Sequence, residues 1–225
     1  MSVAKNKAIQ KIMSDFDKAS NLTLKQLDLL QKVVNTKESG IPPETMQQIK
    51  KNEKKLDRFE LKISDRIINV IVLYNPVASE LRNIMACYRM VTNLERIGDL
   101  IIKSMNYIKK MKDTRLLLLN INDINKMIGL ATEMLTKATF AFLDGNEEDA
   151  RWAINNDIAV DKLDRHISRN SILAEDVFEE VHKVIEDYSS IKSVVSAIER
   201  MADHAGHIGE AAIFALKGKD VRHQG

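Results

Sequence analysis

Four pairs of acidic residues, each with a spacing of four positions, stand out in this sequence. They are Glu53/Asp57, Glu95/Asp99, Asp157/Asp161 and Glu199/Asp203. Residues four apart lie on one face of an α-helix, so each pair would present two carboxylates together. Like charges at this spacing repel each other by roughly 0.3 kcal/mol, and partial burial raises that cost unless a cation compensates. Two such helices side by side would form an all-oxygen site suited to Mg, Mn or Fe ions.

The last two acid pairs repeat the first two at a constant offset. Adding 104 to the number of each residue in the first two pairs leads in every case to another acidic residue. In a chain with 32 acidic residues among 225, one pair carries little weight, but the whole set at one offset does. An internal repeat of this length indicates two similar units in tandem. We therefore predict two domains, at 1–113 and 114–225.

The rest of the sequence predicts the helices that would carry these acids. Between the turn-forming residues, apolar side chains recur every three or four positions, as they do in helices with one buried face. The expected helices of the first half are 3–37, 44–74 and 77–111, and three more are expected from residue 120 onward. No segment alternates apolar and polar residues as a half-buried strand would. The predicted fold class is all-α, with two tandem, pseudo-symmetric three-helix bundles.

The expected hairpins can be checked by symmetry, because facing residues of antiparallel helices lie at equal distances from the turn. The midpoint of Asp57 and Glu95 is Pro76, which fits a turn at 75–76. The equivalent midpoint in the second half is residue 180, in a stretch without Pro or Gly. A helix break at 187–190 is the alternative, and the acids of the second half would then no longer face each other across the hairpin.

Other residues near the acids leave three points open. The acids could be solvated and paired with neighbouring lysines and arginines instead of binding a metal. His204 and His207 could add nitrogen ligands, or could lie at the surface near a helix end. Small residues on the same expected helices would allow close helix packing, or could be tolerated there without a packing role, and these are Gly98, Ala202, Gly206 and Gly209.

The composition excludes several classes of function. Thirty-four basic and 32 acidic residues leave a net charge of +2, which is too small to indicate binding to nucleic acid or to an anionic membrane. The single cysteine, Cys87, excludes an internal disulfide and fits a reducing compartment. We find no phosphate-binding glycine loop, nucleophile elbow or zinc-binding spacing, so the sequence does not favour an enzyme. With no apolar signal region or bilayer-spanning run, we expect a cytoplasmic protein.

Three stretches of the sequence resemble the PhoU family of phosphate-regulatory proteins. They are 75–82 (NPVASELR) leading to 94–99 (LERIGD), 198–204 (IERMADH), and the tail 217–223 (KGKDVRH). The resemblance covers nearly the whole chain as two tandem three-helix units. The family's Glu/Asp-x-x-x-Asp motif matches all four acid pairs. It implies that these acids bind metal ions or multinuclear iron clusters on the surface of the bundle.

The resemblance also implies a role in phosphate regulation. Such proteins are cytoplasmic, often homodimeric adaptors that repress the phosphate-starvation response. They link the ATPase subunit of the phosphate ABC transporter to a sensor histidine kinase, and would reach the membrane only through these partners. Two alternatives stay open, a metal-dependent or redox enzyme that uses the carboxylates and an accessory protein of another phosphate carrier.

Overall fold

The protein is helical throughout most of the residues that the computed structural model describes, which are 2–36, 41–173 and 181–221. The helices are α1 (Ser2–Asn35), α2 (Pro43–Tyr74), α3 (Ala78–Lys110), α4 (Arg115–Leu119), α5 (Ile121–Asp144), α6 (Glu147–Asn155), α7 (Asp157–Leu173) and α8 (Val181–Lys217). No strand occurs within these ranges. The all-α class is confirmed, and the three helices expected in the first half end within two residues of the predicted positions.

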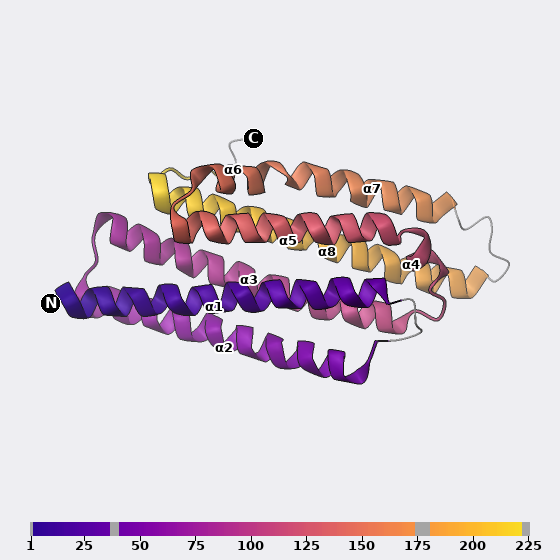
Figure 1. Ribbon diagram of the computed structural model, residues 1–225, viewed down its shortest axis with the longest axis horizontal. Helices are drawn as coiled ribbons and strands as arrows, with labels where there is room; N and C mark the ends of the chain where they lie inside the picture. Colours follow the sequence, from indigo (N-terminus) through magenta and orange to yellow (C-terminus); the bar gives the residue numbers. More distant parts are fainter. Residues whose placement is uncertain (1, 37–40, 174–180, 222–225) are drawn as a thin grey trace.

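The helices form two units that lie side by side (Figure 1). One unit contains α1, α2 and α3, and the other contains α5, α8 and the nearly collinear α6 and α7. α3 and α8 pack against each other more extensively than any other two helices, and α1 packs on α5 across the same interface. The tandem, pseudo-symmetric arrangement is therefore confirmed. The boundary between 113 and 114 stays a prediction, and it falls in the link between α3 and α4.

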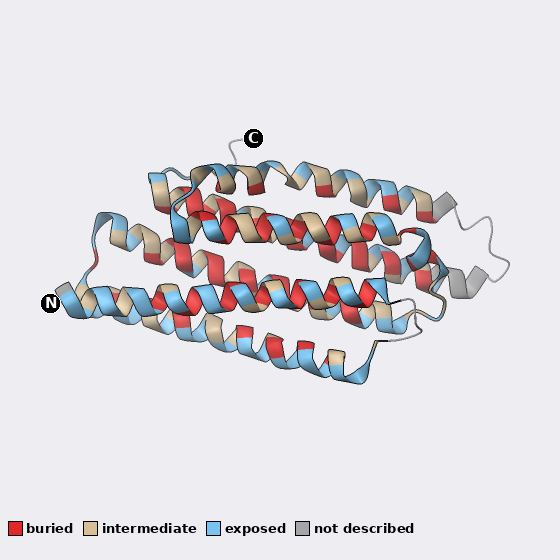
Figure 2. Cartoon of the chain, in the orientation of Figure 1, coloured by how far each residue is buried: buried red, intermediate tan, exposed pale blue. Residues whose placement is uncertain are grey.

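The core follows the apolar stripe of each helix. Buried positions line the inward faces of the helices, and exposed positions cover the outside (Figure 2). Along α3 the fully buried side chains include Ile84, Met90, Leu94 and Ile97. Burying a side chain of this size stabilises the fold by about 1.5–3 kcal/mol. Because α3 is held from both sides, acids next to its buried stripe are kept at fixed positions on its flank.

The turn between α2 and α3 forms where the sequence predicted it. Asn75 adopts a left-handed conformation (φ 43°), and its N–H donates to the Ile71 carbonyl at 3.1 Å. Pro76 lacks an N–H and disfavours helical backbone at the residue before it, so α2 cannot continue. The two helices therefore run antiparallel from this point, and the symmetry argument for their acids holds.

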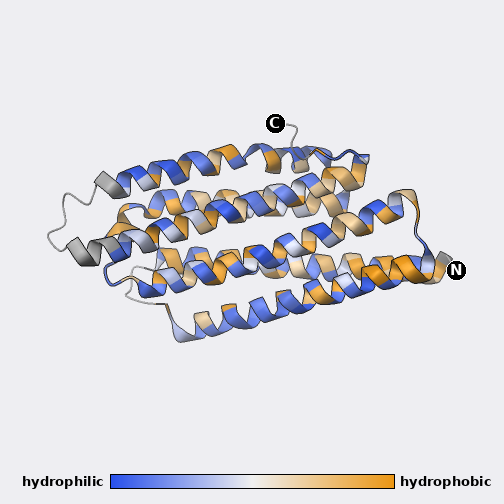
Figure 3. Ribbon diagram, turned by 180° about the vertical axis from the view of Figure 1, so that it is seen from behind, coloured by the Kyte–Doolittle hydropathy of each residue, from blue (hydrophilic) through white to orange (hydrophobic). Residues whose placement is uncertain are grey.

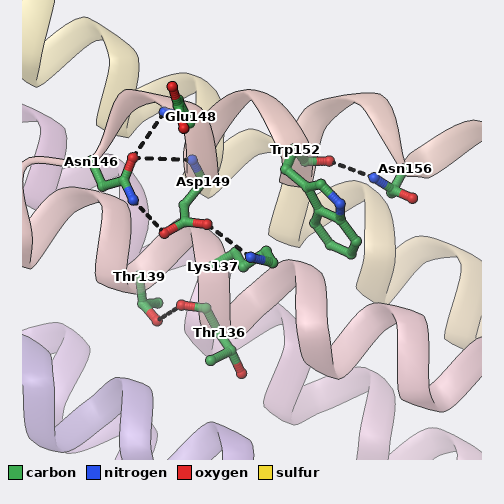
Figure 4. Close-up of polar contacts among 8 residues, drawn as sticks. All are labelled: Thr136, Lys137, Thr139, Asn146, Glu148, Asp149, Trp152 and Asn156. Atoms are coloured by element: carbon green, nitrogen blue, oxygen red, sulfur yellow. Dashed lines mark hydrogen bonds and ion pairs between the residues drawn. The ribbon is translucent and has the colours of Figure 1, made fainter.

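The second half departs from the expected three helices in two ways. An additional short helix, α4, buries Leu116 and Leu117 at the end of the bundle. The middle helix is also interrupted at Asn156, between α6 and α7. Asn156 Nδ2 donates to the Trp152 carbonyl at 2.9 Å, a side-chain contact drawn in Figure 4. Such bonds compete with the helical ladder, but Asn21 and Asn93 form the same bond within the uninterrupted helices α1 and α3, so this bond alone does not cause the break.

The corner between α5 and α6 sets where this interrupted helix begins. Gly145 ends α5 in a left-handed conformation (φ 78°). Asn146 Oδ1 then accepts from the backbone N–H groups of Glu148 and Asp149 at 3.0 and 3.4 Å (Figure 4). Lys137 Nζ lies 2.8 Å from Asp149 Oδ1 and links α5 to α6. The N-terminal cap and this ion pair together fix the start of α6.

The second hairpin is only partly described. The turn predicted at residue 180 lies outside the described residues. Its alternative, a break at 187–190, is wrong because α8 runs through these positions. Asp187 is buried, and its carboxylate accepts from the backbone N–H groups of Lys112 and Asp113 at 2.9 and 3.0 Å. This side chain therefore ties α8 to the segment after α3 and does not end a helix.

Candidate metal centres

The first candidate site lies between α2 and α3. Glu53 and Asp57 on α2 and Glu95 and Asp99 on α3 form one electrostatic cluster, as predicted. Burial raises the pKa of Glu53, and the charges of Asp57 and Asp99 raise it further. Burial likewise raises the pKa of Glu95, with Asp99 as the strongest neighbouring charge. We call these four residues the first cluster.

Basic side chains pair with the two acids of the first cluster that lie on α3. Arg96 Nε lies 3.5 Å from Glu95 Oε2, and Lys103 Nζ lies 4.0 Å from Asp99 Oδ2. Pairing of the acids with neighbouring basic residues thus holds for this helix. Both basic side chains are exposed, and exposed ion pairs contribute about 0–1 kcal/mol. They leave part of the repulsion among the four carboxylates uncompensated.

A close approach of α2 and α3 brings the first cluster together. A methyl group on Gly98 would lie only 2.7 Å from Leu56 Cδ1 on α2. Since Gly98 precedes Asp99 and Leu56 precedes Asp57, the missing side chain lets the two acid-bearing faces approach. The prediction of close packing is confirmed for Gly98.

The glycines of α8 behave differently from one another. A methyl group on Gly209 would lie 3.0 Å from the Ala150 carbonyl oxygen of α6, so this glycine is also needed for close packing. Among the described residues, a methyl group on Gly206 would meet nothing within 4 Å, so this glycine has no packing role and is simply tolerated there. Ala202, at the position equivalent to Gly98, is fully buried.

The second candidate site lies between α7 and α8. Asp157 and Asp161 on α7 act on Glu199 and Asp203 on α8, and we call these four residues the second cluster. Burial, the charges of Asp203 and Asp161, and a hydrogen bond to Asp203 raise the pKa of Asp157 to about 6. Burial and the charge of Glu199 raise the pKa of Asp203. Within the described residues, no basic side chain forms an ion pair with this cluster.

Asp157 occupies an unusual position in the second cluster. It begins α7 because the helix breaks at Asn156, and the positive end of a helix dipole stabilises a carboxylate there. Its Oδ1 atom is nevertheless buried, and no N–H or hydroxyl group of the described residues donates to it. An unpaired buried acceptor costs about 1–3 kcal/mol, and more if it is charged. A cation bound between α7 and α8 would give this oxygen a partner.

Two acids next to the clusters were missed by the sequence interpretation. The charge of Asp164 on α7 raises the pKa of Glu199, and burial raises the pKa of Asp164 itself. The charge of Glu60 on α2 contributes to the raised pKa of Glu95. Asp164 lies 104 positions after Glu60, so the same offset that relates the acid pairs would have found both.

The two histidines near the second cluster have different surroundings. His204 Nδ1 donates to Asn93 Oδ1 at 2.8 Å, which links α8 to α3. Burial lowers the pKa of His204 to about 4, with the charge of His207 adding to the effect. His204 is therefore a neutral contact between the two units. His207 is exposed, and its charge lowers the pKa of Asp157, so it is the histidine that faces the acids.

The donor set of each cluster fits a hard or borderline cation. All eight acids are oxygen donors, and their mutual repulsion and the unpaired Asp157 Oδ1 would both be relieved by positive charge. Across the ranges that the structure covers, no three His, Cys, Asp or Glu side chains converge closely enough to hold one ion. Binding would therefore require the carboxylates of a cluster to turn toward a common point.

The fold and these sites define a class of protein: an all-α chain of two equivalent three-helix units, each with a carboxylate cluster between its outer helix and the helix at the interface of the units. In the described part of the chain, no helix is long and apolar enough to span a bilayer. A model of the PhoU domain matches residues 16–108 and 124–212, and the chain therefore belongs to the PhoU family. The resemblance drawn from the sequence motifs is thus confirmed.

Named relatives and solved structures agree with this membership. A phosphate-specific transport system accessory protein PhoU homolog 1 from Methanothermobacter thermautotrophicus is 28% identical over 93% of both chains. A phosphate-specific transport system accessory protein PhoU homolog from Aquifex aeolicus is 28% identical, over 95% of this chain and 96% of the length of that protein. The crystal structure of PhoU from Pseudomonas aeruginosa has a TM-score of 0.83 at 21% identity, covering 95% of this chain and 99% of that one. This structural likeness establishes the fold.

Proposed function

We propose that this chain is a cytoplasmic, non-enzymatic regulator of phosphate uptake. In this proposal it links the ATPase subunit of a phosphate ABC transporter to a sensor histidine kinase and represses the phosphate-starvation response. The observation that carries the proposal is the match of the PhoU domain to both halves of the chain. Its relatives are named as accessory proteins of a phosphate-specific transport system, which supports association with transport machinery.

We further propose that each carboxylate cluster binds metal, with Fe, Mn or Mg as the candidate ions. Glu53, Asp57, Glu95 and Asp99 would hold one site, and Asp157, Asp161, Glu199 and Asp203 the other. A bound ion would supply the positive charge that these acids lack. The acids themselves would then hold α2 against α3 and α7 against α8, because each cluster takes ligands from two helices.

The surfaces that face a partner would depend on these helix pairs. α2 and α7 are the outer helices of their units, since among the described residues neither packs extensively across the interface that α3 and α8 form. A change in the charge of a cluster would therefore first shift the outer helix of that unit, α2 or α7. A homodimer is part of the same proposal, with both copies presenting these helices.

Affinity capture of the tagged protein from its source cells, grown at low and at high phosphate, tests the adaptor role. We expect a phosphate-transporter ATPase and a histidine kinase among the captured proteins, in proportions that change with phosphate. The same capture with a variant carrying Asp99→Asn and Asp203→Asn shows whether partner binding depends on the metal sites. Recovery of neither partner under either condition would count against the adaptor, and recovery of another phosphate carrier would favour the alternative accessory role.

A further inference from the structure

A basic groove runs between α1 and α2, on the flank of α2 opposite the first cluster. The groove has a volume of about 640 Å³. On α1 it is lined by Lys18, Leu22 and Lys25, which follow one another by one helical turn. On α2 it is lined by Lys55, Arg58, Phe59 and Lys62, at positions i, i+3, i+4 and i+7. Each helix thus presents one continuous face to the groove.

The charge of this groove is entirely of one sign. Five of the described residues that line it are basic, and none is acidic. At one end Asp15 pairs with Lys62 at 3.1 Å and approaches Lys18 at 4.0 Å, so part of the charge there is neutralised. In the described part of the chain, Lys25, Lys55 and Arg58 form no ion pair. For a chain with a net charge of +2, this is a strong local excess.

The floor of the groove is apolar. Leu22 and Phe59 are half-buried and pack against the core, leaving part of each side chain open to the groove. Lys62 Nζ lies 5.9 Å from the centre of the Phe59 ring. The groove therefore offers an apolar contact in its middle, with positive charge at both ends and along its edges.

We propose that this groove is a docking site for an acidic amphipathic helix of a partner protein. Residues seven apart on a helix are separated by about 10.5 Å, so the lysine rows of α1 and α2 match carboxylates seven apart on a third helix. An apolar side chain between those carboxylates would cover Leu22 and Phe59. A polyphosphate or lipid headgroup would satisfy the charges but leave this floor uncovered. The groove is separate from both clusters and goes beyond the proposed metal sites.

The test uses a fluorescein-labelled, alanine-rich peptide of about 20 residues, long enough to be helical. It carries Glu at positions i and i+7 and Leu at i+3 and i+4, and its binding is followed by fluorescence anisotropy. We expect Lys25→Glu with Lys55→Glu to weaken binding at least about tenfold, because each lost pair becomes a repulsion. Lys109→Glu with Lys110→Glu, which changes the net charge equally on exposed residues of α3, should leave binding within about twofold.

Further arms of the experiment separate the proposed occupant from others. Replacing both Leu residues of the peptide by Ser should weaken binding by a similar factor, and added salt should weaken it as well. Equal binding of the Ser peptide, or binding of tripolyphosphate or anionic phospholipid vesicles with the same variant dependence, would overturn the proposal. Self-association abolished by Lys25→Glu with Lys55→Glu would assign the groove to a second copy instead. Circular dichroism checks that each variant is folded.

Discussion

Replacing Asp157 by Asn should make the metal-free protein more stable at neutral pH. Burial and neighbouring carboxylates raise the pKa of Asp157 from 3.8 to about 6 in the folded protein. The folded state therefore holds more protons than the unfolded state between these values, so stability falls as the pH rises through this window. Above about pH 7 the full cost of the charged carboxylate is present. Asn has nearly the same shape, carries no charge and avoids this cost.

The size of the effect follows from the shift and from the exposure of the side chain. A change in pKa from 3.8 to about 6 corresponds to about 3 kcal/mol for a group shielded from solvent. Asp157 is only half-buried, and solvent screening reduces this to about 1 kcal/mol. For a chain of this length, 1 kcal/mol moves the melting temperature by about 2–4 °C. We expect this gain at pH 7.5 and almost none at pH 4.

Differential scanning calorimetry in the presence of a chelator measures this difference directly. Asp65→Asn makes the same chemical change at an exposed position of α2 outside the clusters and should leave the melting temperature nearly unchanged. The protonation of His204 affects wild type and Asp157→Asn equally, so it cancels in the comparison. A gain that is equal at both pH values, or no gain at pH 7.5, would refute the account of the second cluster.

Three other predictions concern substitutions of single residues. Gly209→Ala should lower the free energy of unfolding by about 1–3 kcal/mol, because the added methyl group would meet the Ala150 carbonyl. Gly206→Ala should raise the free energy of unfolding by up to about 1 kcal/mol, because alanine favours a helix more than glycine does. Urea unfolding measures both, and equal effects of the two variants would contradict the packing described for α8. The lowered pKa of His204 means that its contribution to stability is present above pH 6.5 and is lost as the pH falls toward 4. His204→Gln should therefore lose less stability than wild type between pH 7 and 4.5 in urea titrations, and an identical loss would assign the effect elsewhere. Asp164→Asn should weaken Mn binding to the second cluster alone in calorimetric titrations, and unchanged binding would exclude Asp164 from that site.

The sequence was sufficient for the first unit because its signals are local. Pro76 and the preceding Asn75 end one helix whatever surrounds them, and the apolar spacing on either side defines the helices they separate. The constant offset between the acid pairs then located the second cluster on the correct two helices. Extending the offset to Glu60 would also have found Asp164.

What the sequence could not supply depends on contacts between distant residues. Asp187 is in a segment typical of a helix end, and only the backbone of 112–113 makes it an interior residue of α8. The break at Asn156 has no local signal, because Asn21 and Asn93 form the same side-chain bond within uninterrupted helices. The basic groove requires knowing which faces of α1 and α2 meet, and no pattern within either helix specifies that.

The metal content of the purified protein tests the central claim most directly. Elemental analysis of protein prepared without chelator should show stoichiometric Fe, Mn or Mg, because two clusters of four carboxylates are available. Asp99→Asn and Asp203→Asn should each reduce that content, since each change affects one cluster, and the double variant should lose most of it. Wild-type protein without bound metal, which also fails to take up Mn or Fe on titration, would contradict the claim that these clusters are metal sites.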